Sequence, residues 1–516
     1  MLKLIKAHTR LTMWGRESKG KNGHIASLRS VLFLGFVIVL GGFPYLQAQS
    51  PIQLHPDNSR YLQYKGEPIL LITSAEHYGG VLNLDFDYET YLNTLHREGM
   101  NYTRLFTGSY VEVPGSFGIG NNTLAPAVDR FITPWLRTEE EGVFQGEKKV
   151  DLDSWNPAYF DRFHSFMKLA ESLEIIVEVT FFSSNYQDMN WERNPFNDAN
   201  NINGLPKSLD RKKANTPDNG KLLAYQKKMV AKIVEELNPY PNLIYELQNE
   251  PWSDNGEKVY RLVRTIDPGQ KGWYKWADAA NVASMAWQKT IAQTIVDTEA
   301  ALPNKHLIAQ NYTNFAYAIP EVDPNISILN FHYAWPDAVW KNYGWNLPIN
   351  FDESGFYGDS DTTYLRQAWQ FMLAGGAIFN NLDYSFFVGA EKGNGKNEAP
   401  GGGSTTFRKQ LTYLQGFLSS MDFIRMQPDH TVVYHAPGLD VQALSEEGKQ
   451  YALALHGHSQ GWVKLQLPEG EYSWTATSPF TGEEVGQGSF QLSTEGIHKL
   501  DLPAFSEMMG LKVLAK

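Results

Sequence analysis

The sequence contains no cysteine among its 516 residues. Disulfide bonds, thiolate metal sites, a cysteine nucleophile and a lipid-modified N-terminal cysteine are therefore excluded. The same absence means that cysteine usage does not indicate the redox compartment in which the protein works.

The sequence also lacks an excess of positive charge. Lys and Arg number 45 against 57 Asp and Glu, which gives a formal net charge of −12 and a pI near 5.6. Because nucleic acids are bound by basic surfaces, we expect no nucleic-acid partner. Aromatic residues, in contrast, make up 13% of the chain, and an abundance of such rings is typical of ligand clefts.

The first 49 residues have the layout of a secretory signal peptide. An apolar run over residues 31–40 is preceded by four basic residues, Arg16, Lys19, Lys21 and Arg29. The run is shorter than the roughly 20 residues of a membrane-spanning helix, although an uncleaved N-terminal anchor stays open as an alternative. We therefore predict export to the periplasm or the extracellular space, with residues 1–49 removed and no membrane span in the mature chain.

Short apolar runs alternate with helical patterns from Tyr61 onward. A hairpin is predicted around the Lys65-Gly66 turn. Eight runs predict strands: Pro68–Thr73, Tyr102–Phe106, Ile175–Phe182, Leu243–Leu247, His306–Ala309, Ile326–Phe331, Leu347–Phe351 and Ala377–Leu382. Five patterns predict helices: Tyr88–Glu98, Tyr159–Leu173, Leu223–Leu237, Asp278–Thr298 and Thr363–Ala374. Together they predict an α/β fold, a (β/α)8 TIM barrel over residues 50–428 that includes the N-terminal hairpin. An open doubly wound sheet is the alternative, but no Gly-x-Gly-x-x-Gly follows a strand.

The pattern changes after residue 428 to short strands without helical periodicity. The predicted strands are Thr431–Tyr434, Val441–Leu444, Tyr451–His456, Trp462–Leu467, Tyr472–Thr477, Gly488–Leu492 and His498–Leu502. They predict a small antiparallel β-sandwich over residues 429–516 that packs on the barrel. Alternation places Tyr472 and Trp474 on one face, which we expect to be buried against the barrel. His456 and His458 have no third ligand nearby and are interpreted as surface residues, so we predict no metal and no cofactor.

Two glutamates end strands whose carboxyl ends meet at one face of the predicted barrel. Glu250 ends the fourth strand and Glu353 ends the seventh, 103 residues apart, or about 34 residues for each βα unit. Alternation predicts that Glu353 shares a face with Phe351. A convergent pair of carboxyl groups is what glycoside cleavage needs, because one must donate a proton while the other attacks the anomeric carbon. The alternative for each residue is a solvated glutamate at a loop edge.

These two segments resemble a known family. Leu247-Gln248-Asn249-Glu250-Pro251 resembles the Asn-Glu-Pro acid/base signature of clan A glycoside hydrolases, the retaining (β/α)8 enzymes that include family 5 cellulases and mannanases. Asp352-Glu353-Ser354-Gly355 is similar to the clan's strand-seven nucleophile segment. The resemblance covers about residues 60 to 425. It implies that Glu250 is the acid/base, that Glu353 is the nucleophile, and that the reaction retains configuration.

The resemblance also implies roles for neighbouring residues. Arg104 occupies the place of the arginine that supports the nucleophile, and Asn249 that of the asparagine that holds the sugar 2-hydroxyl. His332 and Tyr333 resemble the partners of the nucleophile, which family 5 members usually separate by one residue. Strand three ends without the frequent histidine, and strand eight carries Tyr384 in place of the usual tryptophan.

Three further residues complete the predicted site. Trp252 follows the acid/base segment, and Glu76 and His77 lie in a polar loop after the first strand. That loop is able to bind sugar hydroxyls or to form hydrogen bonds within itself. Glu246, deeper in the barrel, is interpreted as a paired structural charge rather than a catalyst.

The sequence therefore predicts a secreted retaining glycoside hydrolase. We expect it to act as a monomer on an oligo- or polysaccharide and to cleave β-glycosidic bonds in a plant or microbial glycan. The alternative is a carbohydrate-binding protein on a catalytically inactive barrel, which the two intact carboxylates argue against. An esterase is a third possibility, but no Gly-x-Ser-x-Gly follows a barrel strand. The one match, Gly457 to Gly461, lies between two predicted strands of the terminal domain, without the helix that follows a nucleophile elbow.

Overall fold

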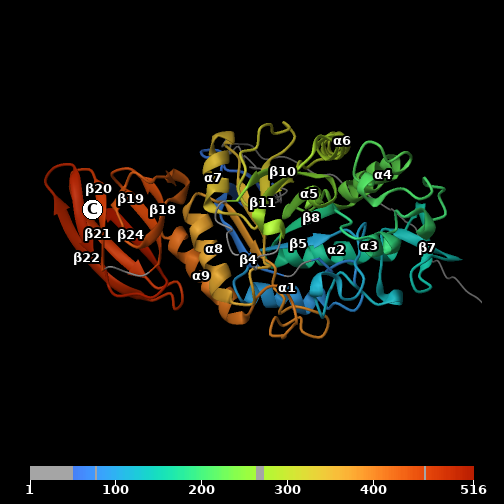
Figure 1. The fold of residues 1–516 in the computed structure, drawn as a ribbon, viewed down its shortest axis with the longest axis horizontal. Coiled ribbons are helices and arrows are strands. Elements are labelled where there is room, and N and C mark those ends of the chain that lie inside the picture. The colour runs from blue at the N-terminus through green and yellow to red at the C-terminus, as the bar shows by residue number, and fades with distance from the viewer. Residues whose placement is uncertain (1–49, 76–77, 263–271, 458–460) are drawn as a thin grey trace, which may run out of the picture. The chain divides into compact units, whose positions relative to one another are not determined.

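The computed structural model describes residues 50–75, 78–262, 272–457 and 461–516 (Figure 1). The predicted signal peptide, Glu76, His77 and His458 lie outside these ranges. Within them, no helix combines the length and the apolar character that a membrane crossing requires.

Eight parallel strands form one barrel-like sheet in the spatial order β4, β15, β14, β13, β12, β9, β8, β5. Their bounds are Leu71–Ser74 for β4, Tyr102–Phe106 for β5, Ile176–Ser183 for β8, Leu243–Asn249 for β9, Leu307–Asn314 for β12, Ile328–His332 for β13, Ile349–Ser354 for β14 and Ile378–Asn381 for β15. In chain order these are the eight strands that the sequence predicts, and the TIM-barrel prediction is confirmed.

A side chain bridges the seam of the barrel between β4 and β5. Among the described residues, no backbone ladder joins these two strands. Asn101, which immediately precedes β5, accepts a hydrogen bond from the backbone N–H of Ile72 at 3.2 Å and donates one to the carbonyl of Leu70 at 2.8 Å. Its amide therefore takes the place of a ladder rung and satisfies backbone groups that burial would otherwise leave unpaired.

Helices surround the sheet (Figure 1). Their bounds are Tyr88–Arg97 for α1, Pro157–Ser172 for α2, Asp188–Arg193 for α3, Leu222–Leu237 for α4, Pro251–Asn255 for α5, Val282–Glu299 for α6, Pro336–Asn342 for α7, Asp361–Leu373 for α8 and Thr405–Ser419 for α9. The caps follow the sequence, since the side chain of Asp87 accepts from Thr90 N–H at the start of α1, and Asn156 accepts from Ala158 N–H before α2.

Two small sheets and an antiparallel extension of the barrel sheet accompany the eight parallel strands. The predicted hairpin is present, with β1 (Gln53–Leu54), β2 (Leu62–Tyr64) and β3 (Glu67–Ile69) pairing in sequence order. The loops at the carboxyl ends of the barrel strands carry two hairpins that the sequence analysis does not predict, β6 (Trp135–Glu141) with β7 (Lys148–Trp155), and β10 (Gly256–Arg261) with β11 (Trp276–Ala280). The predicted start of helix Asp278–Thr298 is wrong for this reason. Asp278 lies in β11 and pairs with Lys258 of β10, and α6 begins only after its N-cap residue, Asn281.

The chain ends in antiparallel strands, as predicted. Their bounds are Gln427–Pro428 for β16, Val433–His435 for β17, Leu439–Glu446 for β18, Gln450–Gly457 for β19, Trp462–Leu467 for β20, Gly470–Thr477 for β21, Glu484–Leu492 for β22, Gly496–Asp501 for β23 and Met508–Ala515 for β24. One sheet has the order β16, β18, β19, β24, β21, β22, and the other β17, β20, β23. β24, which the sequence analysis does not predict, lies inside the larger sheet.

The larger sheet is buried on both faces along β19 and β24. In β19, Tyr451, Leu453 and Leu455 face the interior of the sandwich. Ala452 and Ala454 belong instead to the core shared with the barrel, against α8 and α9. In β24, Gly510 admits the ring of Trp369 from α8, since a Cβ there would lie 2.5 Å from that ring.

The prediction that Tyr472 and Trp474 are buried against the barrel is wrong. Tyr472 is fully buried in the sandwich's own core, and Trp474 packs against the same core. The two rings do point to one side of β21, as alternation requires, but that side is the interior between the two sheets. Where α8 comes close to the sheet, the residues that meet it include the small Ala454 and Gly510.

We expect Ala454→Asp to destabilise the whole protein. The residue is 3% exposed between the larger sheet and α8, so the variant would bury an unpaired carboxylate, at a cost of about 3 kcal/mol. Ser489→Asp, at an exposed position of β22, is the control and should change the stability by less than about 0.5 kcal/mol. Denaturant unfolding of both variants measures the difference, and equal stabilities would contradict the packing described here.

Candidate active site

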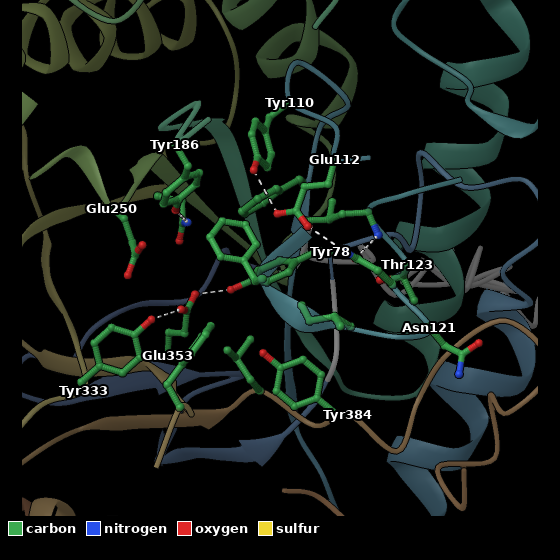
Figure 2. A pocket seen from close by; sticks show the side chains of 18 residues that line it. Tyr78, Tyr110, Glu112, Asn121, Thr123, Tyr186, Glu250, Tyr333, Glu353 and Tyr384 are labelled. Carbon is green, nitrogen blue, oxygen red and sulfur yellow. Dashed lines mark hydrogen bonds between the residues drawn. The ribbon is translucent and has the colours of Figure 1, made fainter. Parts of the chain in front are cut away.

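A pocket at the carboxyl ends of the barrel strands contains both predicted carboxyl groups (Figure 2). About 570 Å³ of empty space lies between its lining side chains, including the part open to solvent. The lining is mainly aromatic and polar, as is usual for a small-molecule site. It consists of Tyr78, Phe106, Tyr110, Glu112, Phe117, Ile119, Asn121, Asn122, Thr123, Leu124, Tyr186, Asn249, Glu250, Tyr333, Glu353, Phe356, Leu382 and Tyr384.

Glu353 lies near the end of β14 and is 5% exposed. The hydroxyl of Tyr333 donates to its Oε1 at 2.9 Å, the hydroxyl of Tyr78 donates to its Oε2, and Nη1 of Arg104 lies 3.3 Å from the same Oε2. Burial alone would raise the pKa of Glu353, but the charge and hydrogen bond of His332, the charge of Arg104 and the hydrogen bond of Tyr78 hold it well below its usual range. This carboxyl group is therefore ionised at neutral pH.

The orientation of Glu353 depends on an irregular strand. Phe351 does not share its face, as alternation predicts, but packs outward on Phe371 of α8 with ring centroids 5.3 Å apart. Asp352 points into the barrel interior, where Asn311 and Asn330 each donate to its Oδ2 at 3.1 Å. The register of β14 shifts against both neighbouring strands next to these residues, and the shift turns Glu353 into the pocket.

Glu250 follows β9 in a left-handed conformation with φ at 46°, immediately before Pro251 begins α5. This conformation is costly for a residue with a Cβ and is often found at functional sites. Its Oε1 lies 3.0 Å from Nδ1 of His332, and Ser253 donates to Oε2 at 3.4 Å. Oxygen atoms of Glu250 and Glu353 lie within 4.8 Å of one another. The two predicted carboxyl groups therefore converge.

His332 lies between the two carboxyl groups. Its Nδ1 is 3.0 Å from Glu250 and 3.4 Å from Glu353, and its Nε2 is 3.3 Å from Oδ2 of Asp352. Burial would lower the pKa of His332, but the charges of Glu353 and Asp352 raise it well above its usual value. The ring is therefore protonated. Its Nδ1 donates to Glu250, and its Nε2 forms an ion pair with Asp352.

Tyr333 reaches the pocket although it follows His332 directly in the chain. Adjacent residues of a regular strand point to opposite faces, and family 5 members avoid this problem with one intervening residue. Here Tyr333 has a left-handed backbone with φ at 51°, beyond the last residue of β13. This turn brings the hydroxyl of Tyr333 to Glu353, so the contact forms without a residue between His332 and Tyr333.

Arg104 is fully buried, and each of its five N–H groups has an acceptor. Nε and Nη2 donate to the two oxygens of Glu246 at 2.8 and 2.9 Å, and Nη2 also donates to Asn249 at 2.6 Å. Nη1 donates to the hydroxyl of Tyr78 at 2.9 Å and to Glu353. Arg104 and Glu246, the predicted supporting arginine and structural glutamate, thus form one ion pair. Arg104 also contacts Glu353 and so connects this pair to the pocket.

Buried acidic groups outnumber the cations beneath the pocket. Burial, together with the nearby charges of Glu246 and Asp352, raises the pKa of Glu178 to about 8. Burial also raises the pKa of Glu246, against the opposing charge of Arg104. Glu178 is therefore protonated at neutral pH, which relieves repulsion among the carboxyl groups.

Among the residues that the structure describes, two groups of three have spacings that a metal ion would accept. They are Glu246, His332 and Asp352, and Glu250, His332 and Glu353. Both need a neutral His332 as a ligand, whereas its surroundings favour the protonated ring. The arrangement is explained by ion pairs within the protein.

Three further residues of the predicted site lie in the pocket or next to His332. Asn249 lines the pocket between Arg104 and the hydroxyl of Tyr186, to which it donates at 2.7 Å. Tyr384 also lines the pocket. Trp252 packs edge-on against His332, with ring centroids 5.4 Å apart. Glu76 and His77 lie outside the described residues.

The structure adds pocket residues that the predicted site does not contain. Tyr78 contacts Glu353, Tyr186 contacts Asn249, and Glu112 supplies a third carboxyl group. All three lie in loops after barrel strands, where binding residues concentrate. No local sequence pattern separates them from other aromatic and acidic loop residues.

No protein-family model and no curated protein matches the sequence. Solved structures match the fold. A candidate glycoside hydrolase of Bacteroides vulgatus ATCC 8482 has a TM-score of 0.61 at 11% sequence identity, over 91% of this chain and 83% of that one. A family 5 glycoside hydrolase of the same organism has a TM-score of 0.56 at 14% identity, over 90% and 93% of the chains. A third, described as a glycoside hydrolase, has a TM-score of 0.55 at 12% identity, over 90% and 97%. The predicted resemblance to glycoside hydrolases is confirmed at the level of the fold.

We expect Arg104→Lys to destabilise the protein by about 3 to 5 kcal/mol, because an ammonium group cannot replace the five donors and leaves buried carboxylates partly unpaired. Arg130→Lys is the control. Arg130 also pairs with a carboxylate, Asp85, but it is 45% exposed, and the change should cost less than about 1 kcal/mol. Denaturant unfolding at pH 7 compares the two, and a small loss at Arg104 would contradict its central role.

Proposed function

We propose that the protein is a secreted retaining glycoside hydrolase that cleaves β-glycosidic bonds in a plant or microbial glycan. The observation that carries the proposal is the approach of Glu250 and Glu353 to within 4.8 Å across one pocket, at the ends of β9 and β14. Retaining enzymes have carboxyl groups about 5 to 5.5 Å apart, whereas inverting enzymes keep about 6.5 to 9.5 Å for a water molecule. The export and the β-linkage rest on the sequence pattern and the family resemblance.

In the first step an ionised Glu353 attacks the anomeric carbon. The bond between that carbon and the glycosidic oxygen breaks, its electron pair stays on the oxygen, and Glu250 gives the oxygen its proton. The sugar is then an ester of Glu353. His332 donates to Oε1 of Glu250, so we assign the transferred proton to Oε2.

In the second step Glu250 is a carboxylate and removes a proton from water. The water oxygen forms a bond to the anomeric carbon as the ester bond to Glu353 breaks, which restores both carboxyl groups. Tyr78, Tyr333 and Arg104 stabilise the carboxylate of Glu353 as it leaves.

We expect the two glutamate variants to respond differently to azide. Glu353→Ala should lose turnover and regain it with azide, and the product should have the anomeric configuration opposite to that of the substrate. Glu250→Ala should keep activity on aryl glycosides with good leaving groups, because these need little acid assistance, and azide should give a product of retained configuration. NMR of the glycosyl azides identifies the two configurations, and reversed products would show that the roles are exchanged.

We expect the dependence of kcat/KM on pH to be bell-shaped, with its maximum on the acidic side of neutral. Activity falls at low pH because Glu353 becomes protonated, and the low pKa of that residue places this limb in the acid range. Activity falls at higher pH because the first step needs a protonated acid to assist the leaving group. A flat profile between about pH 4 and pH 9 on an aryl β-glycoside would argue against paired-carboxylate catalysis. An inactive carbohydrate-binding protein would bind glycans without turnover at any pH.

A further inference from the structure

An aromatic wall extends from Glu353 to a third carboxyl group, Glu112. The ring of Tyr78, whose hydroxyl contacts Glu353, stacks on Phe106 with centroids 4.3 Å apart. Phe106 contacts Tyr110 edge-on at 5.9 Å, and the hydroxyl of Tyr110 donates to Oε1 of Glu112 at 3.0 Å. Figure 2 shows Glu250 and Glu112 on opposite sides of Glu353.

Beyond Glu112, two loops that follow different barrel strands are joined to each other by hydrogen bonds. Asn121, in the loop after β5, receives the side chain of Asn397, in the loop after β15. The backbone N–H of Asn121 donates to Oδ1 of Asn397 at 2.8 Å, and Nδ2 of Asn397 donates to the carbonyl of Asn121 at 2.8 Å. Next to this pair, the N–H of Gly120 donates to the carbonyl of Glu398 at 2.8 Å.

A third loop packs against the same place. A Cβ on Gly79 would lie only 2.5 Å from the carbonyl oxygen of Thr123. The loop after β4 therefore approaches Thr123 more closely than any residue other than glycine would allow. The side chain of Asn83 donates to the same carbonyl at 3.0 Å. We define the closed end of the pocket by Gly79, Asn121, Thr123 and Asn397.

Glu112 is 5% exposed and lines the pocket just before the closed end. Its Oε1 accepts from Tyr110, and its Oε2 accepts from Nδ2 of Asn122 at 2.5 Å. Two carboxylate oxygens offer about four acceptor sites, so both are able to accept further hydrogen bonds. Burial raises the pKa of Glu112 to about 7. No ion pair involves this carboxyl group in the described part of the chain.

We propose that the pocket holds one terminal sugar, with its non-reducing end at Glu112, and that the protein releases single sugars from chain ends. This inference rests on the proposed function. The anomeric carbon must lie between Glu353 and Glu250, and the leaving group must lie on the side of Glu250, which donates the proton. The rest of the sugar then extends along the aromatic wall towards Glu112.

The closed end excludes a further sugar beyond the first. Glu112 would accept hydrogen bonds from hydroxyl groups at the non-reducing end of the bound sugar. In an internal unit of a chain, one of those hydroxyls is replaced by a glycosidic bond, which has no hydrogen to donate. The site therefore selects chain ends by shape and by the loss of one hydrogen bond between the sugar and Glu112.

The test uses the full-length protein and β-linked oligosaccharides of six units with a fluorescent label at the reducing end, after a panel of aryl β-glycosides has identified the sugar. We expect the first products to be one monosaccharide and a labelled chain shortened by one unit. Labelled fragments of mixed length at early times would overturn the inference and leave the glycosidase proposal standing. Absence of cleavage of every aryl glycoside and oligosaccharide would overturn both.

Variants test the two parts of the argument separately. Glu112→Gln should lower kcat/KM on the aryl monoglycoside about tenfold or more, mainly through KM, while Glu139→Gln, exposed on β6, should change neither parameter. Asn397→Ala removes the hydrogen bonds between Asn397 and Asn121, which lie near the protein surface. This variant should release some disaccharide. An unchanged KM in a Glu112→Gln protein with the parent melting temperature would overturn the role of Glu112. Exclusive monosaccharide release by Asn397→Ala would overturn the role of that contact.

Discussion

The buried guanidinium of Arg104 is the interaction on which the rest of the site depends. Its planar group contacts Glu246 on one edge, and Asn249, Tyr78 and Glu353 on the others. A single side chain therefore fixes residues from two other barrel strands and one loop. Such an ion pair gains little net stability when complete, but an incomplete one leaves charges in a medium that cannot solvate them. The geometry of the carboxyl groups above it therefore has few alternatives.

The sequence predicts the order of the barrel strands well because their buried segments are apolar and continuous. It predicts their ends poorly. The fifth strand was expected to stop at Ala309, yet β12 continues to Asn314, and Asn311 contributes to the polar network inside the barrel. β24 is not predicted because its pairing with β19 is long-range, and the β10–β11 hairpin is not predicted because its strands are half-exposed. α9 is also absent from the predicted helices, although its apolar residues recur at helical spacing.

The candidate site shows a similar division. Strand-end position and short motifs predict Glu250 and Glu353 as neighbours, and the family resemblance adds Arg104. The bulge that turns Glu353 into the pocket and the left-handed backbone of Tyr333 are not visible in the sequence, because they arise from pairing between strands. Tyr78, Tyr186 and Glu112 come from loops whose paths no periodicity describes.

The packing of α8 has a consequence for engineering. Phe371 of this helix supports Phe351, two residues before Glu353, while Trp369 of the same helix lies against Gly510 of the terminal sheet. Only one helix therefore separates β14, which carries Glu353, from the sandwich. Because displacements of about 1 Å in a reacting group are costly, the sandwich is not an exchangeable module, and a chimera that replaces it must reproduce the surface that supports α8.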